Sequence, residues 1–170
     1  MIGNGEPRVW SGDDLEHRFD AESVGRALAL VGERWSLLIL RETFFGVRRY
    51  GEFARNLSIP RPTLSARLKT LVDAGILDRV RYLTEPDRYE YRLTQAGRDL
   101  FPAIVTLMQW GDRHLAGPEG PPILLRHEDC GEIAETYVAC RNCGGDITAD
   151  RVTPEAGPAY RSATSEPGTE

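Results

Sequence analysis

The sequence predicts a mainly α-helical fold with one small β-hairpin, an α+β class, followed by a short cysteine-containing β segment. Three observations support this prediction. Apolar residues recur at spacings of three and four over most of residues 21–115, as they do on one face of a helix. Two short runs rich in Val, Tyr and Leu, separated by a turn, interrupt this spacing and indicate a hairpin. After residue 116 the composition changes to Gly and Pro and then to His and Cys.

These changes in composition divide the chain into five segments. Residues 1–20 lack sustained periodicity and are expected to form a flexible arm, and residues 21–115 are expected to hold the main domain. The Gly- and Pro-rich residues 116–122 indicate a linker. Residues 123–152 contain the cysteines, whereas residues 153–170, rich in Pro, Ser, Thr, Gly and Glu, are expected to be disordered.

The composition favours a soluble protein of the cytoplasm. No apolar run approaches the roughly 20 residues that span a bilayer, and residues 1–20 are too polar and acidic for a signal peptide. The net charge of −5 is unevenly distributed: residues 21–115 hold 15 Lys and Arg against 11 Asp and Glu, whereas the segments on either side are acidic. A basic segment between acidic ends is typical of a surface that meets nucleic acid, although an ordinary solvated surface gives similar counts.

Two helices are expected before residue 50. In the first, apolar residues share one face: Val24, Ala27, Leu28 and Val31. The second, over residues 34–45, is expected to end before Gly46. It is expected to direct four apolar side chains to the core and two charged ones outward: Trp35, Leu38, Ile39 and Phe45, and Arg41 and Glu42.

Residues 50–73 predict two helices joined by a tight turn. Residues 50–57 give a short helix, and the turn that follows contains two prolines. Pro62 fits the first turn of a helix and disfavours helical geometry at the residue before it, so the second helix is expected over residues 62–73. Its apolar stripe is narrow: Leu64, Leu68 and Leu71. A helix, a tight turn and a helix form the pair with which many proteins read DNA.

A hairpin directly after this pair completes the prediction of a winged helix-turn-helix. Residues 76–83 and 89–93 are expected to form two strands, with a turn at residues 84–88 between them. A last long helix is expected over residues 95–115. Its apolar side favours a dimer interface over packing within one chain: Leu100, Ile104, Leu107 and Trp110.

The orientation of the second helix of the pair predicts which side chains meet DNA. With the leucines turned inward, three side chains are expected near base edges: Thr63, Ala66 and Lys69. Thr70 also points outward and is expected among the DNA-binding residues. Flanking side chains suit phosphates: Arg61, Ser65 and Arg67. Alternatives remain open, because Arg67 could pair with Asp73 or a neighbouring helix and Lys69 could be merely solvated. Asp73 has the wrong sign for DNA and is expected to turn away or to have a structural role.

Basic residues outside this helix extend the expected contact. Arg88, at the tip of the wing, is placed to reach phosphate at the minor groove. Four further arginines are expected to meet the DNA backbone, with an ordinary solvated surface as the alternative: Arg79 and Arg81 in the first strand, and Arg48 and Arg49 before the helix pair. Tyr89 and Tyr91 are expected on the other side, in the core, with stacking on nucleic-acid bases as the alternative.

Six motifs follow one another over residues 21–115: Val31-Gly32-Glu33-Arg34-Trp35, Leu37-Leu38-Ile39-Leu40-Arg41, Arg49-Tyr50-Gly51-Glu52-Phe53, Leu64-Ser65-Ala66-Arg67-Leu68 with Leu71, Ala74-Gly75-Ile76-Leu77, and Arg88-Tyr89-Glu90-Tyr91-Arg92-Leu93-Thr94 with Gly97. Each motif is weak alone, but in this order they resemble the HxlR family of bacterial winged-helix regulators. The resemblance implies a homodimer on a pseudo-palindromic operator in double-stranded DNA and regulation, often repression, of nearby genes. Thiol-sensing members carry a cysteine where this chain has Glu22, so the resemblance implies no redox sensing at that position.

Two short motifs in residues 123–152 predict a zinc-ribbon-like site. Each has two possible ligands separated by two residues and followed by glycine, a turn that brings both ligands to one ion. The expected ligands are His127, Cys130, Cys140 and Cys143, with a short hairpin between the two motifs. Four protein ligands make the zinc structural, and it would stabilise a segment too small for a core. Reduced, metal-free cysteines and a labile thiol switch or disulfide are the alternatives.

Two classes of function follow. The first is a dimeric transcription regulator, and the second is a protein-interaction or zinc-binding adaptor whose winged helix no longer binds DNA. An enzyme is disfavoured, because His17, His114 and His127 are scattered and no catalytic constellation or phosphate-binding loop stands out. Apolar helices around Trp35 and Trp110 leave room for a small-molecule effector, although such Trp residues more often belong to a core.

Overall fold

The structure, a computed structural model, describes residues 22–155 and 157–158. The predicted arm, residues 1–20, and most of the predicted disordered tail lie outside the described residues. The chain divides into two compact units, and Thr136 is the last residue of the larger one. The remaining described residues, from Tyr137 onward, belong to the second unit, and each unit is described by itself. The boundary falls inside the segment that contains the cysteines.

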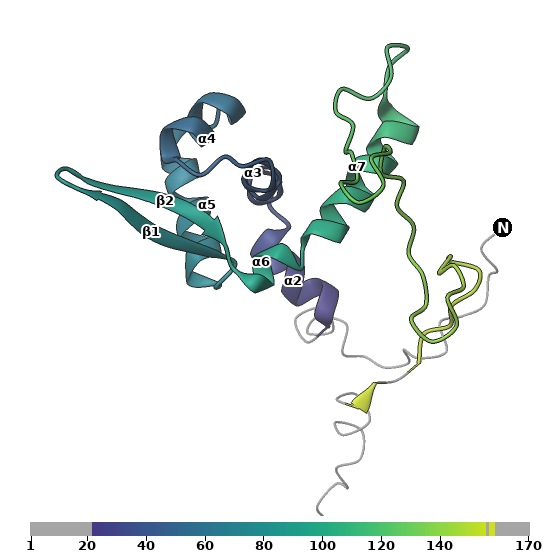
Figure 1. The fold of residues 1–170 in the computed structure, drawn as a ribbon. Coiled ribbons are helices and arrows are strands. Elements are labelled where there is room, and N and C mark those ends of the chain that lie inside the picture. Colours follow the sequence, from purple (N-terminus) through teal and green to yellow (C-terminus); the bar gives the residue numbers. More distant parts are fainter. Residues whose placement is uncertain (1–21, 156, 159–170) are drawn as a thin grey trace, which may run out of the picture. The chain divides into compact units, whose positions relative to one another are not determined.

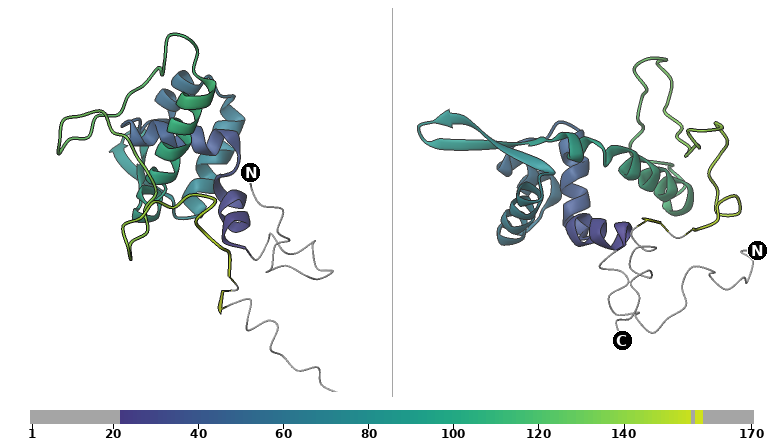
Figure 2. Two further views of the ribbon diagram at one scale, coloured as in Figure 1. Left: turned by 90° about the vertical axis from the view of Figure 1, so that its right-hand side faces the viewer. Right: turned by 90° about the horizontal axis from the view of Figure 1, so that it is seen from below.

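The larger unit is mainly helical with one two-stranded antiparallel sheet, as the sequence predicts. The hairpin projects beyond the helices in Figure 1 and in the right-hand view of Figure 2. The elements are α2 (Ser23–Val31), α3 (Arg34–Phe44), α4 (Tyr50–Leu57), α5 (Arg61–Asp73), β1 (Leu77–Thr84), β2 (Asp87–Leu93), α6 (Gln95–Arg98) and α7 (Phe101–Leu115). In the part of the chain that the structure describes, no helix is long and apolar enough to cross a membrane.

The core forms around α3, which contacts α2, α4, α5, α7 and β2. The predicted leucine stripe of α5 is confirmed, because Leu64, Leu68 and Leu71 are fully or almost fully buried. Ile39 and Leu40 of α3 are buried against the same cluster, and Phe53 contributes from α4. Burying each of these side chains stabilises the fold by about 1.5–3 kcal/mol.

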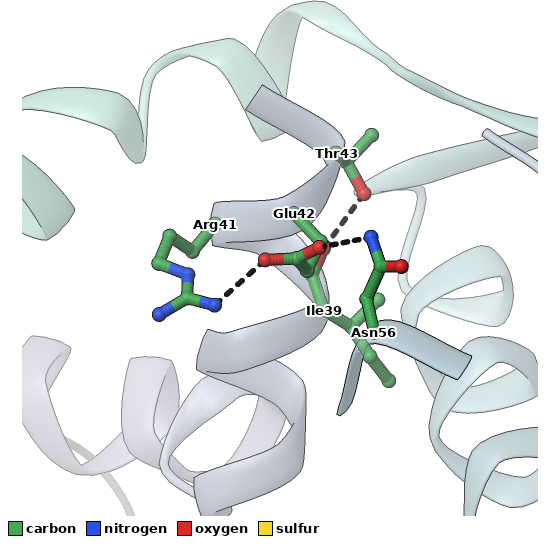
Figure 3. Close-up of polar contacts among 5 residues, drawn as sticks. All are labelled: Ile39, Arg41, Glu42, Thr43 and Asn56. Atoms are coloured by element: carbon green, nitrogen blue, oxygen red, sulfur yellow. Dashed lines mark hydrogen bonds and ion pairs between the residues drawn. The ribbon is translucent and has the colours of Figure 1, made fainter. Parts of the chain in front are cut away.

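The end of α3 differs from the sequence prediction. Glu42 is buried, although it was expected to face solvent, and Phe45 is 39% exposed, although it was expected in the core. The helix ends at Phe44, so the side chain of Phe45 no longer follows the buried face. The Glu42 carboxylate accepts hydrogen bonds from Arg41 (2.6 Å) and from Asn56 of α4 (2.8 Å), as Figure 3 shows. These bonds offset the desolvation of the buried charge and join α3 to α4.

The hairpin has a tighter turn than the sequence predicts. Leu77 pairs with Leu93 at its base and Thr84 pairs with Asp87 at its tip, so only two residues remain in the turn. The chain before α4 adds to the base of the hairpin, because the Tyr91 N–H donates to the Arg48 carbonyl at 2.8 Å. The wing is therefore joined to the beginning of the helix pair.

The predicted long helix over residues 95–115 is interrupted. It divides into α6 and α7, with Pro102 in the first turn of α7. Proline has no N–H to donate, and its ring clashes with a carbonyl one turn earlier, so it ends an α-helix that would otherwise continue. The α7 helix also holds the chain that follows it. Gln109 donates to the Ala134 carbonyl (3.1 Å) and accepts from the Thr136 hydroxyl (2.6 Å).

Candidate nucleic-acid interface and cysteine turns

The outer face of α5 is free of cover from the described chain. Its leucine side is anchored in the core, and the opposite side exposes mostly small and polar residues: Arg61, Pro62, Ser65, Ala66, Lys69 and Asp73. Thr63, Arg67 and Thr70 lie half-buried on the flanks. The helix is therefore accessible at Ala66 and Lys69, two of the residues expected near base edges, whereas Thr63 is half-buried.

Tyr50 positions the beginning of α5, a role that the sequence analysis missed. Its hydroxyl donates to the Arg61 carbonyl at 2.9 Å and lies 3.1 Å from the Ser65 hydroxyl. Tyr50 is the first residue of α4, so these bonds fix the angle between the two helices of the pair. Ser65, expected to contact phosphate, already has a partner within the protein. The motif around Tyr50 signals a helix start, but a contact eleven residues away leaves no periodic signal in the sequence.

Glu52 fixes the backbone in front of α4. One carboxylate oxygen accepts the N–H groups of Arg49 (3.1 Å) and Arg48 (3.4 Å). The pKa of Glu52 lies below its ordinary value, chiefly because the Arg49 N–H bond stabilises the charged form. Both arginine side chains are exposed, but the Arg49 guanidinium lies 4.8 Å from the ring centre of Tyr82, whereas Arg48 has no such contact.

Several polar side chains on α5 have partners within the chain. Lys69 forms an ion pair with Asp73 one turn later, and both side chains are exposed. Arg67 pairs across to Glu33, at the start of α3, at 3.8 Å. This is the internal pairing with a neighbouring helix that the sequence analysis left open.

The strand register corrects the predicted faces of the wing. Arg79 pairs with Tyr91 and Arg81 pairs with Tyr89, and directly opposed residues of antiparallel strands point to the same face. The tyrosines therefore share the face of the arginines instead of lying opposite them. The Arg79 guanidinium lies 3.6 Å from the ring centre of Tyr89, and Arg81 pairs with Asp87 at 2.7 Å.

Tyr91 belongs to the core at the base of the wing, as expected. Its ring meets Phe53 edge to face, with 6.3 Å between the ring centres. Burial raises the pKa of its hydroxyl, because the charged form is poorly solvated there. The base of the hairpin is thus fixed to α4, and its outer part extends from that anchor.

Three of the predicted DNA contacts keep unpaired cationic side chains. Among the described residues, the side chains of Arg48, Arg61 and Arg88 have no hydrogen bond, ion pair or ring contact, and all three are exposed. Arg88 lies within β2, opposite Leu83, and not in the turn itself. These three guanidinium groups are the ones that need not exchange a partner in order to bind phosphate.

Two helices expose large apolar side chains. Val24 and Leu28 of α2 are 60% and 56% exposed, and Leu107 and Trp110 of α7 are 55% and 50% exposed. Trp110 is therefore not a core residue, whereas Trp35 is half-buried against the core cluster. Large apolar side chains exposed on two helices are characteristic of a surface that meets a partner. An effector cleft near the two Trp residues remains a prediction.

The cysteine motifs form turns without strands. From residue 116 to residue 155 no strand is present, and the expected hairpin between the motifs is replaced by one isolated β-bridge at each turn. All three cysteines are free of disulfides. Among the described residues no three His, Cys, Asp or Glu side chains gather as a metal site, and each turn by itself supplies two of the four predicted ligands.

Comparisons with known proteins agree with this arrangement. The family model for the HxlR-like helix-turn-helix matches residues 30–118. Uncharacterised HTH-type transcriptional regulators of Mycobacterium bovis (strain ATCC BAA-935 / AF2122/97) and Mycobacterium tuberculosis (strain ATCC 25618 / H37Rv) are each 66% identical to the chain over 149 residues. The match covers 88% of this chain and 94% of each relative, so it continues beyond the family region.

The solved structures that resemble this chain are also those of regulators or candidate transcription factors. The chain is similar to PA1607, a candidate transcription factor, with 32% identity and a TM-score of 0.74. That similarity covers 84% of this chain and 99% of PA1607. The redox regulator HypR in its oxidised form is 30% identical, with a TM-score of 0.51, over 55% of this chain and 98% of HypR. The similarity to PA1607 therefore includes part of the chain outside the winged helix.

Proposed function

Since the chain belongs to the HxlR-like helix-turn-helix family of DNA-binding transcriptional regulators, we propose that it binds a pseudo-palindromic operator as a homodimer and represses the adjacent genes. The observation that carries the proposal is α5. Its Leu64, Leu68 and Leu71 are at most 1% exposed, while the opposite side is free of cover from the described chain. A helix that is packed on one side and exposed on the other can enter a major groove without rearrangement of the fold. We propose the cytoplasm as its compartment, because a transcription regulator has to reach the DNA that it binds.

The contacts that we propose divide into two groups. Ala66 and Thr63 approach base edges, where their methyl groups suit a thymine methyl, with Lys69 and Thr70 on the same face. Arg48, Arg61 and Arg88 bind phosphates, because their charges have no partner among the described residues. Six predicted contacts have partners within the chain, and we expect them to contribute less: Ser65, Arg67, Lys69, Thr70, Arg79 and Arg81. Arg49, stacked on Tyr82, joins this second set.

The homodimer is proposed from the apolar surface of α2 and α7. A monomer would leave Leu28, Leu107 and Trp110 half or more exposed to water, and burying such side chains against a second copy is favourable. Sedimentation of the full chain tests this step. We expect a dimer for the parent and a monomer for Leu107→Glu, whereas a monomeric parent would remove the dimer from the proposal.

The DNA-binding step is tested by selecting duplexes from a random library with the full chain and then titrating the best duplex at several salt concentrations. We expect the affinity to fall steeply with salt, because neutralised phosphates release counterions. Arg61→Ala and Arg88→Ala each reduce the salt slope by about one. Arg151→Ala is the matched control, because Arg151 is exposed and lies outside the winged helix. No enriched duplex, or binding that is indifferent to salt, would favour an adaptor.

Repression is tested separately, with a reporter gene placed under a promoter that carries the selected duplex. We expect expression to rise when the regulator is removed or when Arg61→Ala replaces it. Expression that falls on removal would make the protein an activator while leaving the DNA contact intact. The two assays therefore distinguish the sign of regulation from the binding itself.

A further inference from the structure

The turn that contains His127 has a defined backbone pattern. The His127 N–H donates to the Glu132 carbonyl at 2.9 Å, and the Gly131 N–H donates back to the His127 carbonyl at 2.8 Å. Arg126 and Ile133 form an antiparallel bridge across the base of the turn. Gly131 has a φ of +73°, a conformation that glycine adopts without steric cost.

The turn that contains Cys140 repeats this pattern at every position. The Cys140 N–H donates to the Gly145 carbonyl and the Gly144 N–H donates to the Cys140 carbonyl, both at 2.8 Å. Ala139 and Asp146 form the bridge at the base, and Gly144 has a φ of +72°. A further hydrogen bond closes each turn at the same relative positions: Ala134 to Leu125 at 2.7 Å, and Ile147 to Val138 at 2.8 Å.

The two turns share this geometry although their sequences differ. The first is His-Glu-Asp-Cys-Gly-Glu-Ile and the second is Cys-Arg-Asn-Cys-Gly-Gly-Asp. What they have in common is a metal-ligating residue type at the first and fourth positions and a glycine at the fifth. The turn is thus built twice around the same pair of ligand positions, which a chance loop conformation does not explain.

The side chains of the first turn are spaced for a metal. His127 Nδ1 lies 3.4 Å from Cys130 Sγ. Zinc bonds of about 2.3 Å to sulfur and about 2.0–2.1 Å to nitrogen, at a tetrahedral angle, place these two atoms about 3.6 Å apart. The other ring nitrogen, Nε2, lies 3.7 Å from an Asp129 carboxylate oxygen. A metal-bound imidazole commonly has such a carboxylate beside its second nitrogen.

This part of the chain has ordered turns but no core. No residue from 116 to 155 is buried, and its larger apolar side chains are exposed, among them Tyr137 at 73% and Val138 at 53%. Leu125 is half-buried, but no fully buried apolar side chain holds the turns in shape. Segments of this size generally need a metal or a disulfide to be stable, and the three cysteines are free of disulfides.

We propose that each of the two turns is a zinc-binding turn, with His127 and Cys130 as the ligands in the first and Cys140 and Cys143 as the ligands in the second. Each turn by itself supplies two of the four protein ligands that a structural zinc uses. The site is independent of the DNA contact, and it stabilises the part of the chain that follows α7.

The test uses the full chain, expressed without a histidine tag and purified without chelator, with zinc measured by mass spectrometry. We expect about one zinc per chain, because each chain offers four ligands and a structural zinc uses four. Cys143→Ser and His127→Gln are expected to lose most of it, whereas His114→Gln retains it. His114 is the matched control, because it is an exposed histidine outside both turns. Replacement of zinc by Co²⁺ adds a visible spectrum that reports tetrahedral thiolate ligation in the parent and is absent from Cys143→Ser.

Three outcomes would overturn the proposal. The first is a native chain without zinc whose three thiols all react with a thiol reagent. The second is zinc that persists in both Cys143→Ser and His127→Gln, since the ligands would then lie elsewhere. The third is a disulfide between Cys140 and Cys143 in the purified protein. Because none of these measurements involves DNA, failure here leaves the proposed regulator intact, and failure of DNA binding leaves the zinc site intact.

Discussion

Gly97 lies where α6 approaches the beginning of the wing, and the structure leaves no room there for a side chain. A Cβ at this position would lie 2.3 Å from the Ile76 carbonyl oxygen and 3.0 Å from a methyl carbon of Leu93. That oxygen also accepts the N–H of Thr94, at 3.1 Å. The Thr94 hydroxyl in turn accepts the Gly97 N–H at 3.1 Å and so caps α6. Gly97→Ala therefore acts on the junction between the hairpin and the last two helices.

The magnitude follows from the size of the overlap. Carbon and oxygen atoms in close contact lie about 3.3–3.6 Å apart, so α6 or the backbone at Ile76 has to move by about 1 Å. Overpacking of this kind costs about 1–3 kcal/mol, and weakening the Thr94 bond costs about 0.5–1.5 kcal/mol. Replacing a helical glycine by alanine raises the free energy of unfolding by at most about 1 kcal/mol. We expect a net loss of about 2 kcal/mol, which lowers the Tm of a domain this size by about 8–16 °C.

Urea unfolding of the full chain, followed by far-UV circular dichroism, measures the change. Gly51→Ala is the matched control, because a Cβ there meets nothing within 4 Å. In the control only the helix preference acts, and we expect a gain of about 0.5–1 kcal/mol. The two variants carry the same chemical change with opposite expected signs. A Gly97→Ala protein as stable as the parent would refute the packing described at this junction.

Three further predictions concern the polar contacts that hold the helix pair. Glu42→Ala is expected to lower the free energy of unfolding by about 2 kcal/mol, because it leaves Asn56 without an acceptor. Asn56→Ala removes one hydrogen bond and is expected to lower the free energy of unfolding by less. A larger loss for Asn56→Ala than for Glu42→Ala in urea unfolding would contradict this assignment. Tyr50→Phe removes the hydroxyl that fixes α5, so the free energy of unfolding is expected to fall by about 0.5–1.5 kcal/mol. The affinity for the selected duplex is also expected to fall. An unchanged affinity would show that Tyr50 does not position α5 for DNA binding. The lowered pKa of Glu52 contributes stability that is complete above the ordinary value of 4.5 and is lost as the pH falls through the lowered value. Glu52→Gln is expected to make the free energy of unfolding depend less on pH in this acid range. An identical pH dependence in parent and variant would contradict this prediction.

The central helix pair is predictable from sequence because its signals are local. Leucines at positions 64, 68 and 71 specify the buried face of α5, and the prolines before them specify where the helix begins. The structure agrees to within one residue at the helix start. The interruption between α6 and α7 could also be predicted from the local sequence, since Pro102 lies inside the predicted helix.

The errors arise where a distant residue decides the outcome. Glu42 is buried because Asn56, fourteen residues later, donates to it, and the periodicity of α3 contains no sign of that partner. The faces of the wing depend on strand register, and an irregularity in the ladder changes the register by one residue. The register shift between Arg81 and Leu83 brings Arg81 opposite Tyr89, so these side chains share a face.

The central claim is that the outer face of α5 enters the DNA groove. Ala66→Asp tests it most directly, because Ala66 is exposed in the middle of that face and a carboxylate there repels phosphate and base acceptors without disturbing the core. Ala96→Asp places the same charge at an exposed position of α6. Titration of the selected duplex by fluorescence anisotropy is expected to show a loss of roughly 10- to 100-fold for Ala66→Asp and little change for Ala96→Asp. Equal affinities for Ala66→Asp and the parent would contradict the account.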